Sequence, residues 1–204
     1  MKPPRIPPMA VDIIQTALSA IDGAVFTDLA ACPYCGGMVS GYDNKTRQFA
    51  VVEEQEMRRT IQIRVKRFRC RECNKLCYAD QPFYPDTRIG SPVVDLSVTL
   101  TANMPATRAA RVLSSVGICV DRTSCLLFAR RFRQDIRTAE VFGMRIPFSI
   151  LTLSNLAARN FESGPLPGSD ILTACGFPSA FHAAPDVSLD KRNNRDEHNE
   201  REER

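Results

Sequence analysis

The sequence lacks any long apolar run and any secretory signal. No stretch reaches the roughly 18 uncharged apolar residues that a transmembrane helix requires, and the amino-terminal sequence MKPPRIPP has no apolar segment behind its positive charge. We therefore expect a soluble, cytoplasmic protein with no membrane partner. Thiols stay reduced in that compartment, so paired cysteines indicate metal ligands before disulfides.

Histidine is scarce as well. The two histidines, His182 and His198, have no Cys, Asp or Ser partner in view, so we expect both at the surface and neither in catalysis.

The net charge is only +4, but the basic residues are concentrated: residues 57–77 hold eight Arg or Lys against one acid, and residues 105–137 hold seven Arg against two Asp. Two separate basic blocks predict a polyanionic partner.

Cysteine, in contrast, is abundant, and four of the eight cysteines form two matched pairs. The pairs are Cys32-Pro33-Tyr34-Cys35 and Cys70-Arg71-Glu72-Cys73. A tight turn presents two thiolates about three residues apart, and zinc binds four such ligands in a tetrahedron. The residue after each pair, Gly36 or Asn74, tolerates positive φ. We therefore predict one structural zinc ion bound by all four cysteines, since a closed set leaves no position for a reactive water.

The remaining cysteines give weaker signals. Cys77 lies four residues after the second pair and is either an alternative ligand or a small buried residue. Cys119, Cys125 and Cys175 stand alone, a pattern that favours ordinary buried thiols over nucleophiles.

Between the cysteine pairs the pattern changes to β-strand. Apolar and polar residues alternate over 59–70, a second strand is predicted over 47–53, and a turn is predicted at 43–45. The alternation breaks at Arg67-Phe68, which predicts a bulge or a strand end there. The result is a small antiparallel sheet with one basic face. The cations predicted to contact DNA phosphates from this sheet are Arg64, Lys66, Arg67 and Arg69.

Further along the chain, three helices are predicted to form a helix-turn-helix over about residues 91–102, 105–115 and 121–133, although the first also alternates like a strand. Gly117 supplies the turn, and Asp121 caps the last helix. One face of that helix is apolar. The other side offers side chains suited to base edges and phosphates, namely Arg122, Thr123, Arg130 and Arg131. Leu127 on this side faces either a thymine methyl or a second copy of the chain, so a homodimer stays open.

The stretch FRCRECNKLCYADQPFYPDTRIGSPVVDLSVTLTANMPATRAARVLSSVGICVDRTSC resembles the N-terminal part of insertion-sequence transposases. In that family a zinc ribbon is followed by a helix-turn-helix that binds the terminal repeats of the element. The resemblance covers about residues 30–134 and favours a helix at Ser91–Ala102. Those enzymes continue into an acidic-triad nuclease domain, whereas here the later acidic residues (Glu140, Glu162, Asp170 and Asp186) follow no recognisable strand framework. We therefore expect this chain to share the DNA binding of that family but not its strand-transfer activity, and we expect that the chain is not an enzyme.

These features predict an α+β fold, with a small antiparallel zinc ribbon followed by a three-helix helix-turn-helix domain and a poorly ordered C-terminal region. The expected segments are 1–29 as an extension with a short helix, 30–80 as the zinc ribbon, 90–137 as the helix-turn-helix, 138–185 as uncertain and partly ordered, and 186–204 as a disordered charged tail.

The expected function is zinc-dependent binding of double-stranded DNA, as a transcription regulator or a transposase accessory. One alternative is the DNA-binding subunit of a truncated or split transposase that lacks its nuclease domain. A second alternative is a zinc ribbon that binds other proteins, because ribbons often dock onto proteins.

The composition of the tail generates a first test. Residues 186–204 contain only Val187 and Leu189 as apolar residues, so burial there cannot offset the entropy lost on ordering the chain. Deletion of 186–204 should leave both the zinc content and the melting temperature unchanged, as measured by metal analysis and thermal denaturation. A large fall in melting temperature would show that the tail packs against the fold.

Overall fold

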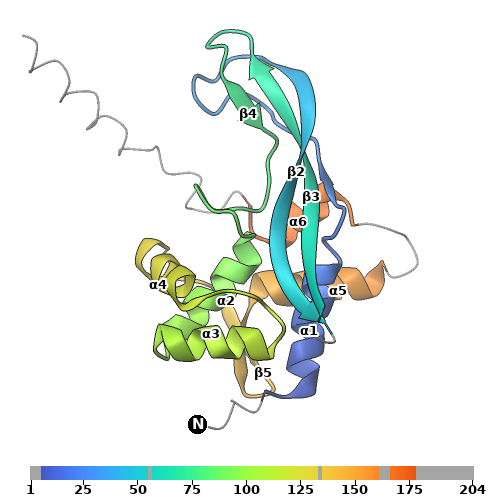
Figure 1. The fold of residues 1–204 in the computed structure, drawn as a ribbon. Helices are drawn as coiled ribbons and strands as arrows, with labels where there is room; N and C mark the ends of the chain where they lie inside the picture. The colour runs from blue at the N-terminus through green and yellow to red at the C-terminus, as the bar shows by residue number, and fades with distance from the viewer. Residues whose placement is uncertain (1–5, 55–56, 133–134, 161–165, 178–204) are drawn as a thin grey trace, which may run out of the picture.

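The computed structural model describes residues 6–54, 57–132, 135–160 and 166–177. The fold is mixed α+β, and a long β-hairpin stands on a base of helices (Figure 1). In chain order the elements are α1 (Pro8–Ser19), β1 (Val25–Phe26), β2 (Val39–Glu54), β3 (Met57–Cys70), β4 (Leu76–Tyr78), α2 (Ser91–Thr101), α3 (Ala106–Ser115), α4 (Arg122–Arg131), β5 (Thr138–Val141), β6 (Met144–Pro147), α5 (Phe148–Arg159) and α6 (Gly168–Ala174). The predicted tail and both histidines lie outside the described residues.

The hairpin is longer than predicted. β2 pairs antiparallel with β3 along the whole of β3, and β1 and β4 add short pairings to the other edge of β3. Residues 43–45, predicted as a turn, are strand residues paired with residues 65–67, and the chain reverses between Glu54 and Met57 instead. The turn prediction is wrong because cross-strand hydrogen bonds override the local turn preference of Asp and Asn.

The predicted irregularity at residues 67–68 exists, but it lies in the neighbouring strand. Phe68 pairs with Gly41 and Arg67 pairs with Asp43, so the extra residue is Tyr42 of β2. β3 therefore keeps its alternation, with successive side chains on opposite faces. The bulge therefore interrupts the regular pairing on the β2 side only.

The buried face of β3 changes along its length. Ile61, Ile63 and Val65 are fully buried on one face, whereas Phe68 and Cys70 are buried on the other. The first three belong to the core shared with the helices, and Cys70 belongs to a small second core at the cysteine end. One strand therefore contributes to both the helical base and the cysteine end.

Helix α2 lies at the centre of the base. Residues 91–100 are all buried, which explains why the sequence of α2 shows no amphipathic helical pattern and also resembles a strand. Its carboxylate, Asp95, accepts hydrogen bonds from the Tyr84 hydroxyl at 2.5 Å and the Ser149 hydroxyl at 2.9 Å. Burial raises the pKa of Asp95 to about 6, although both hydroxyls act in the opposite direction.

The turn between α3 and α4 is hydrogen-bonded to the hairpin. The Glu53 N–H donates to the Gly117 carbonyl at 2.8 Å, and the Cys119 N–H donates to the Val51 carbonyl at 2.9 Å. Ile118 between them is buried. Gly117 has φ +77, and a β-carbon there would lie 2.8 Å from the Glu53 carbonyl oxygen. This position therefore requires glycine.

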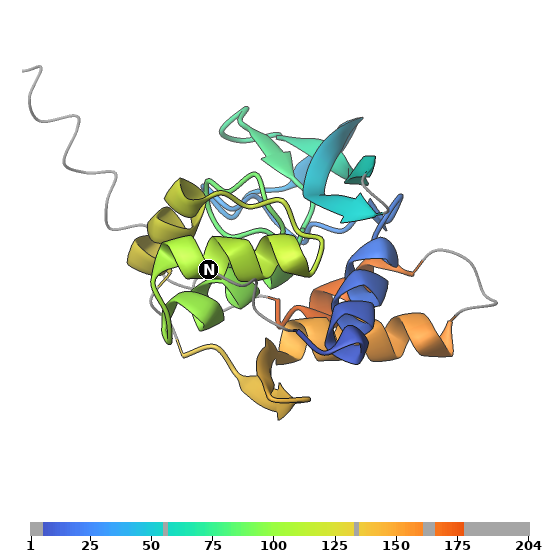
Figure 2. The ribbon, with the colours of Figure 1, turned by 60° about the horizontal axis from the view of Figure 1, so that its bottom comes forward.

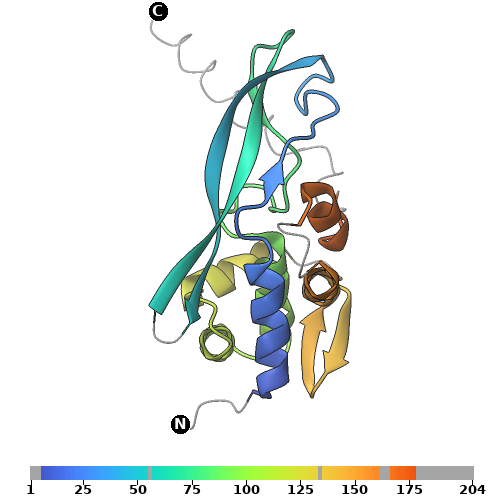
Figure 3. The ribbon, with the colours of Figure 1, turned by 90° about the vertical axis from the view of Figure 1, so that its right-hand side faces the viewer.

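The described residues from 138 onward, which are 138–160 and 166–177, complete the base. Figures 2 and 3 show α5 beside α1, with the β5–β6 hairpin at the edge next to α5. Buried Ile146, Ile150 and Ile171 join the same core as the hairpin and α2. Side-chain packing thus crosses the segment boundaries expected near residues 80–90 and 138.

The turn at Gly117 generates a test of this packing. Gly117→Ala should lower the free energy of unfolding by about 2–4 kcal/mol, because it combines positive φ with a contact against backbone. Gly143→Ala is the matched control, since Gly143 has φ +74 and open space around its α-carbon. It should cost only about 1–2 kcal/mol. Equal losses in urea unfolding would mean that the turn does not press against the hairpin.

Candidate metal centre

Two turns bring the four predicted ligands together at the end of the hairpin away from α1. Cys32 and Cys35 precede β2, Cys70 ends β3, and Cys73 follows in the next turn. Their sulfur atoms all lie within 4.8 Å of one another. The Cys35 and Cys70 sulfurs are 3.5 Å apart, and those of Cys32 and Cys73 are 3.6 Å apart. Zinc–sulfur bonds of about 2.3 Å place tetrahedral ligands about 3.8 Å apart, so the arrangement fits one zinc ion.

The two turns share the same backbone geometry. The Cys32 N–H donates to the Gly37 carbonyl, and the Cys70 N–H donates to the Lys75 carbonyl, each at 3.0 Å. Gly36 has φ +74 and Asn74 has φ +58. These are the two residues predicted to need positive φ, and the structure confirms that prediction. The Cys73 N–H also points at the Cys70 sulfur, 3.5 Å away.

The four thiols differ in their affinity for protons. Burial raises the pKa of Cys32, but the backbone N–H groups of Tyr34 and Cys35 outweigh it and lower the pKa to about 6. At the exposed Cys35, the Gly37 N–H lowers the pKa, yet hydrogen bonds with Cys70 and Cys73 raise it to about 12. The metal-free site therefore holds protons at neutral pH, and a metal must displace them as it binds.

The four cysteines form a site for a single metal ion, and the donor set is that of structural zinc. Four thiolates complete the coordination and leave no open position for substrate or water. Among the described residues, this is the one cluster of three or more Cys, His, Asp or Glu side chains close enough to hold a metal. This cluster confirms the predicted cofactor, one structural Zn²⁺.

Cys77 is buried, as expected for a small buried residue, but it also lies beside one of the metal ligands. Its sulfur lies 3.6 Å from the Cys32 sulfur, although Cys77 is not one of the four clustered ligands. The spacing of Cys77 after the second pair marks it in the sequence. Nothing local in the sequence indicates that it contacts Cys32.

The predicted basic residues of the ribbon divide between two faces. Because β3 alternates without a break, Arg64 and Lys66 lie on one face, and Arg67 and Arg69 lie on the other. The prediction of one basic face is wrong, since it required a bulge in β3 that lies instead in β2. Arg64 and Arg69 are exposed, and Lys66 is half-buried with its ammonium group 5.3 Å from the centre of the Phe68 ring.

Two residues that the sequence did not mark as functional, Asp43 and Tyr42, contact the Arg67 guanidinium. Asp43 forms a two-point ion pair with the Arg67 guanidinium, with Nε to Oδ1 at 2.5 Å, and this hydrogen bond lowers the pKa of Asp43. The exposed Tyr42 ring has the Arg67 guanidinium 5.6 Å and the Arg69 guanidinium 5.8 Å from its centre. The Asp-Asn sequence indicated a turn, which concealed this cross-strand pair.

Helix α4 has the two predicted faces. Cys125, Phe128 and Phe132 are buried, and the Asp121 carboxylate caps the helix by accepting the Ser124 N–H at 2.7 Å. The residues exposed on the other side are Arg122, Thr123, Leu127, Arg130 and Arg131. Arg131 is already paired, since its guanidinium lies 2.6 Å from the Asp86 carboxylate. This helix belongs to the base, whereas the cysteines lie at the other end of the molecule (Figure 1).

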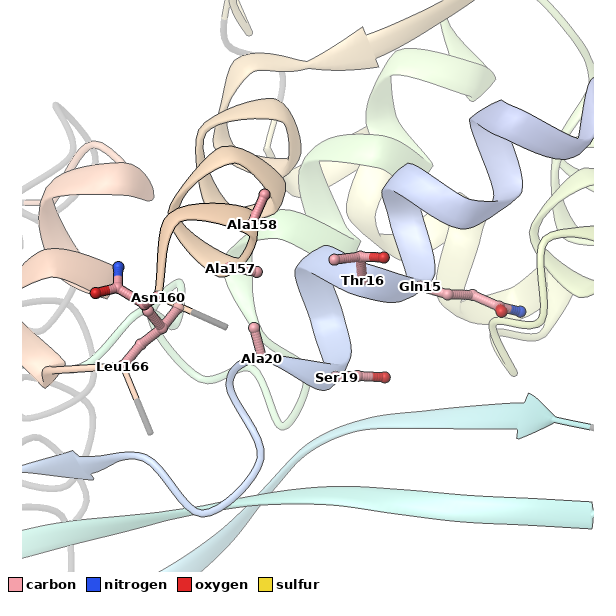
Figure 4. Close-up of a pocket in the computed structure, with 8 residues that line it drawn as sticks. All are labelled: Gln15, Thr16, Ser19, Ala20, Ala157, Ala158, Asn160 and Leu166. Carbon is pink, nitrogen blue, oxygen red and sulfur yellow. The ribbon is translucent and has the colours of Figure 1, made fainter. Parts of the chain in front are cut away.

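A cavity in the helical base contributes no comparable chemistry. A space of about 430 Å³ lies between α1 and the end of α5 (Figure 4). Its described lining is neutral: Gln15, Thr16, Ser19, Ala20, Ala157, Ala158, Asn160 and Leu166. These side chains supply neither a metal ligand nor a group that titrates near neutral pH. The candidate site is therefore the cysteine cluster together with the surrounding cations.

Comparison with known proteins agrees with the metal centre. Residues 28–73 match the family model described as the zinc-finger of transposase IS204/IS1001/IS1096/IS1165. This segment contains both cysteine pairs and the whole of β2 and β3, and β1 lies just upstream of it. No curated protein and no solved structure matches the chain. Within the described residues, none of the helices is long and apolar enough to cross a membrane.

The ligand geometry predicts a strict dependence on all four cysteines. Purified protein should contain one zinc ion per chain, and Cys35→Ser should lose both the metal and the ribbon fold, because structural zinc contributes on the order of 10 kcal/mol or more. Metal analysis and circular dichroism test this. Cys119→Ser is the control. Cys119 lies outside the cluster, so this variant should keep its zinc. Zinc-free protein with an unchanged spectrum would contradict the assignment.

Proposed function

We propose that the protein binds double-stranded DNA in its zinc-loaded form, as a transcription regulator or as an accessory factor in transposition. The observation that carries the proposal is the coincidence of a transposase-type zinc ribbon with exposed cations on its central strand. The metal is structural in this proposal: it holds the ribbon in shape, and the cations contact the DNA. No catalytic step is assigned to the chain.

The ribbon supplies contacts to phosphates. Within the described part of the chain, no carboxylate lies within ion-pair distance of Arg64, Lys66 or Arg69. Cations without a carboxylate partner can neutralise phosphates without first breaking an ion pair. Such contacts are independent of base sequence and weaken steeply with salt. Arg67 is a weaker candidate for a phosphate contact than these three residues, because Asp43 already neutralises its charge.

Helix α4 supplies the contacts to bases in a helix-turn-helix formed with α3. Its cap, its buried face and the Gly117 turn support this interpretation. Thr123 and Arg130 are exposed, and side chains of these types form hydrogen bonds with base edges in the major groove. Arg122 adds a phosphate contact at the start of the helix, and Arg131 would first have to leave Asp86.

The family match specifically favours a second candidate, in which the chain is the DNA-binding part of a transposase. The two candidates differ in the DNA that they bind. A transposase subunit should prefer the terminal repeats of an element, whereas a regulator should prefer sites near promoters. Selection of bound sequences from random duplex DNA by the zinc-loaded protein separates them. A zinc ribbon that binds only other proteins would select no sequence.

A homodimer is also proposed as a testable arrangement. Leu127 is 54% exposed in the middle of the α4 surface, and an apolar side chain there is suited either to a thymine methyl group or to a second α4. If Leu127→Ala abolished self-association and Arg130→Ala left specificity intact, α4 would be a dimer interface. Base recognition would then have to lie elsewhere.

Substitutions in the two proposed DNA-contacting surfaces should affect DNA binding in different ways. The double variant Arg64→Ala with Lys66→Ala should weaken binding to all duplexes alike and reduce the slope of log K against log salt by about two. Arg130→Ala should cost about 1–3 kcal/mol on the selected site and little on random DNA. Fluorescence anisotropy at several salt concentrations measures both effects.

The matched control for these variants is Arg159→Ala. It also removes one exposed charge, but from the end of α5, away from both proposed surfaces. It should change the affinity and the salt slope little. If Arg159→Ala weakened binding as much as Arg130→Ala, and the double variant weakened it about twice as much in free energy, the effect would come from net charge alone, and neither surface would be a specific contact.

A further inference from the structure

A fifth cysteine contacts the metal centre. The sulfur of Cys77 lies 3.6 Å from the sulfur of the ligand Cys32, a separation suited to an S–H···S hydrogen bond. The Cys77 side chain is 2% exposed and that of Cys32 is 3% exposed. Leu29 and Val39 pack against this small core, so the two sulfurs meet in apolar surroundings.

The position of Cys77 is set by strand pairing and not by the first ligand turn. Cys77 is the middle residue of β4 and pairs with Phe68 of β3. The Cys32 turn lies 45 residues earlier in the chain. The Cys77 S–H group has a second acceptor within reach, the Lys75 carbonyl oxygen at 3.8 Å, but the Cys32 sulfur at 3.6 Å is nearer. Strand pairing therefore presents the Cys77 thiol to Cys32 from an element that does not depend on the first turn.

Cys77 does not belong to the ligand set. The four sulfurs that lie within 4.8 Å of one another exclude it, and four thiolates complete the tetrahedron of zinc. A cysteine that is not bound to metal keeps its S–H group, which is a hydrogen-bond donor. Cys32, as a metal-bound thiolate, is an acceptor.

We infer that Cys77 is a positioning residue for the metal centre, whose thiol donates a hydrogen bond to the Cys32 thiolate. Four thiolates around Zn²⁺ leave a net charge of −2, and Cys32 is a buried member of that set. A donor at this sulfur spreads the charge and restrains the side chain of the ligand. Groups that orient metal ligands in this way typically contribute 10–100-fold, in order of magnitude, to metal affinity. The family match ends at residue 73, so Cys77 lies outside the matched zinc finger.

Zinc affinity of the full chain tests the inference. Cys77→Val keeps an apolar side chain of similar size and removes the donor, and it should weaken zinc binding about 10–100-fold in competition with a chromophoric chelator. Cys77→Ser restores a donor and should recover most of the affinity. Cys125→Val is the matched control, because Cys125 is a fully buried cysteine of the helical core and should leave zinc affinity unchanged.

Cobalt substitution separates a hydrogen bond from simple packing. The sulfur-to-cobalt charge-transfer band of Cys77→Val should move to lower energy and return in Cys77→Ser, because a hydrogen bond stabilises the sulfur lone pairs. The band intensity should still report four thiolates. Wild-type affinity and an unchanged band in Cys77→Val would overturn the inference. Loss of one thiolate from the spectrum would also overturn it, since Cys77 would then be a ligand. If Cys77→Val fails to fold, Cys77→Ala against Cys77→Ser gives the same comparison.

Discussion

The antiparallel pairing of β2 with β3 joins the two ends of the molecule. Near Glu54 the hairpin exchanges backbone hydrogen bonds with the turn between α3 and α4, and at the far end Cys70 is both the last residue of β3 and a metal ligand. The buried face changes from the side of Ile63 to the side of Phe68 between these points. The metal centre and the helical core are therefore connected through one hydrogen-bonded element.

The cations of this chain differ in how far they are already neutralised. Arg67 and Arg131 are held by carboxylates, whereas Arg64 projects from the exposed side of β3. A phosphate gains less at a paired arginine, because an existing charge-assisted hydrogen bond must be broken first. The density of basic residues in the sequence therefore overstates the surface that a polyanion can use.

The helices of the base depend on one another for burial. Every residue of α2 from Ser91 to Leu100 is buried, and Asp95 ties this helix to Tyr84 in the preceding connection and to Ser149 in α5. Such a helix has no exposed face of its own and requires α3, α4, α5 and β6 around it. A helix-turn-helix in this protein would present α4 from a larger core than three helices alone can provide.

The metal centre and the two faces of α4 could be predicted from the sequence. Both depend on short-range geometry: a tight turn brings two thiolates together, Gly36 and Asn74 accept positive φ, and helical spacing separates Phe128 from Arg130. Three other features could be seen only in the folded chain: the bulge lies in β2, α2 is buried on all sides, and the Cys77 sulfur contacts the Cys32 sulfur. These features depend on strand register and on contacts between segments far apart in the chain, and no local pattern of residues encodes such distances.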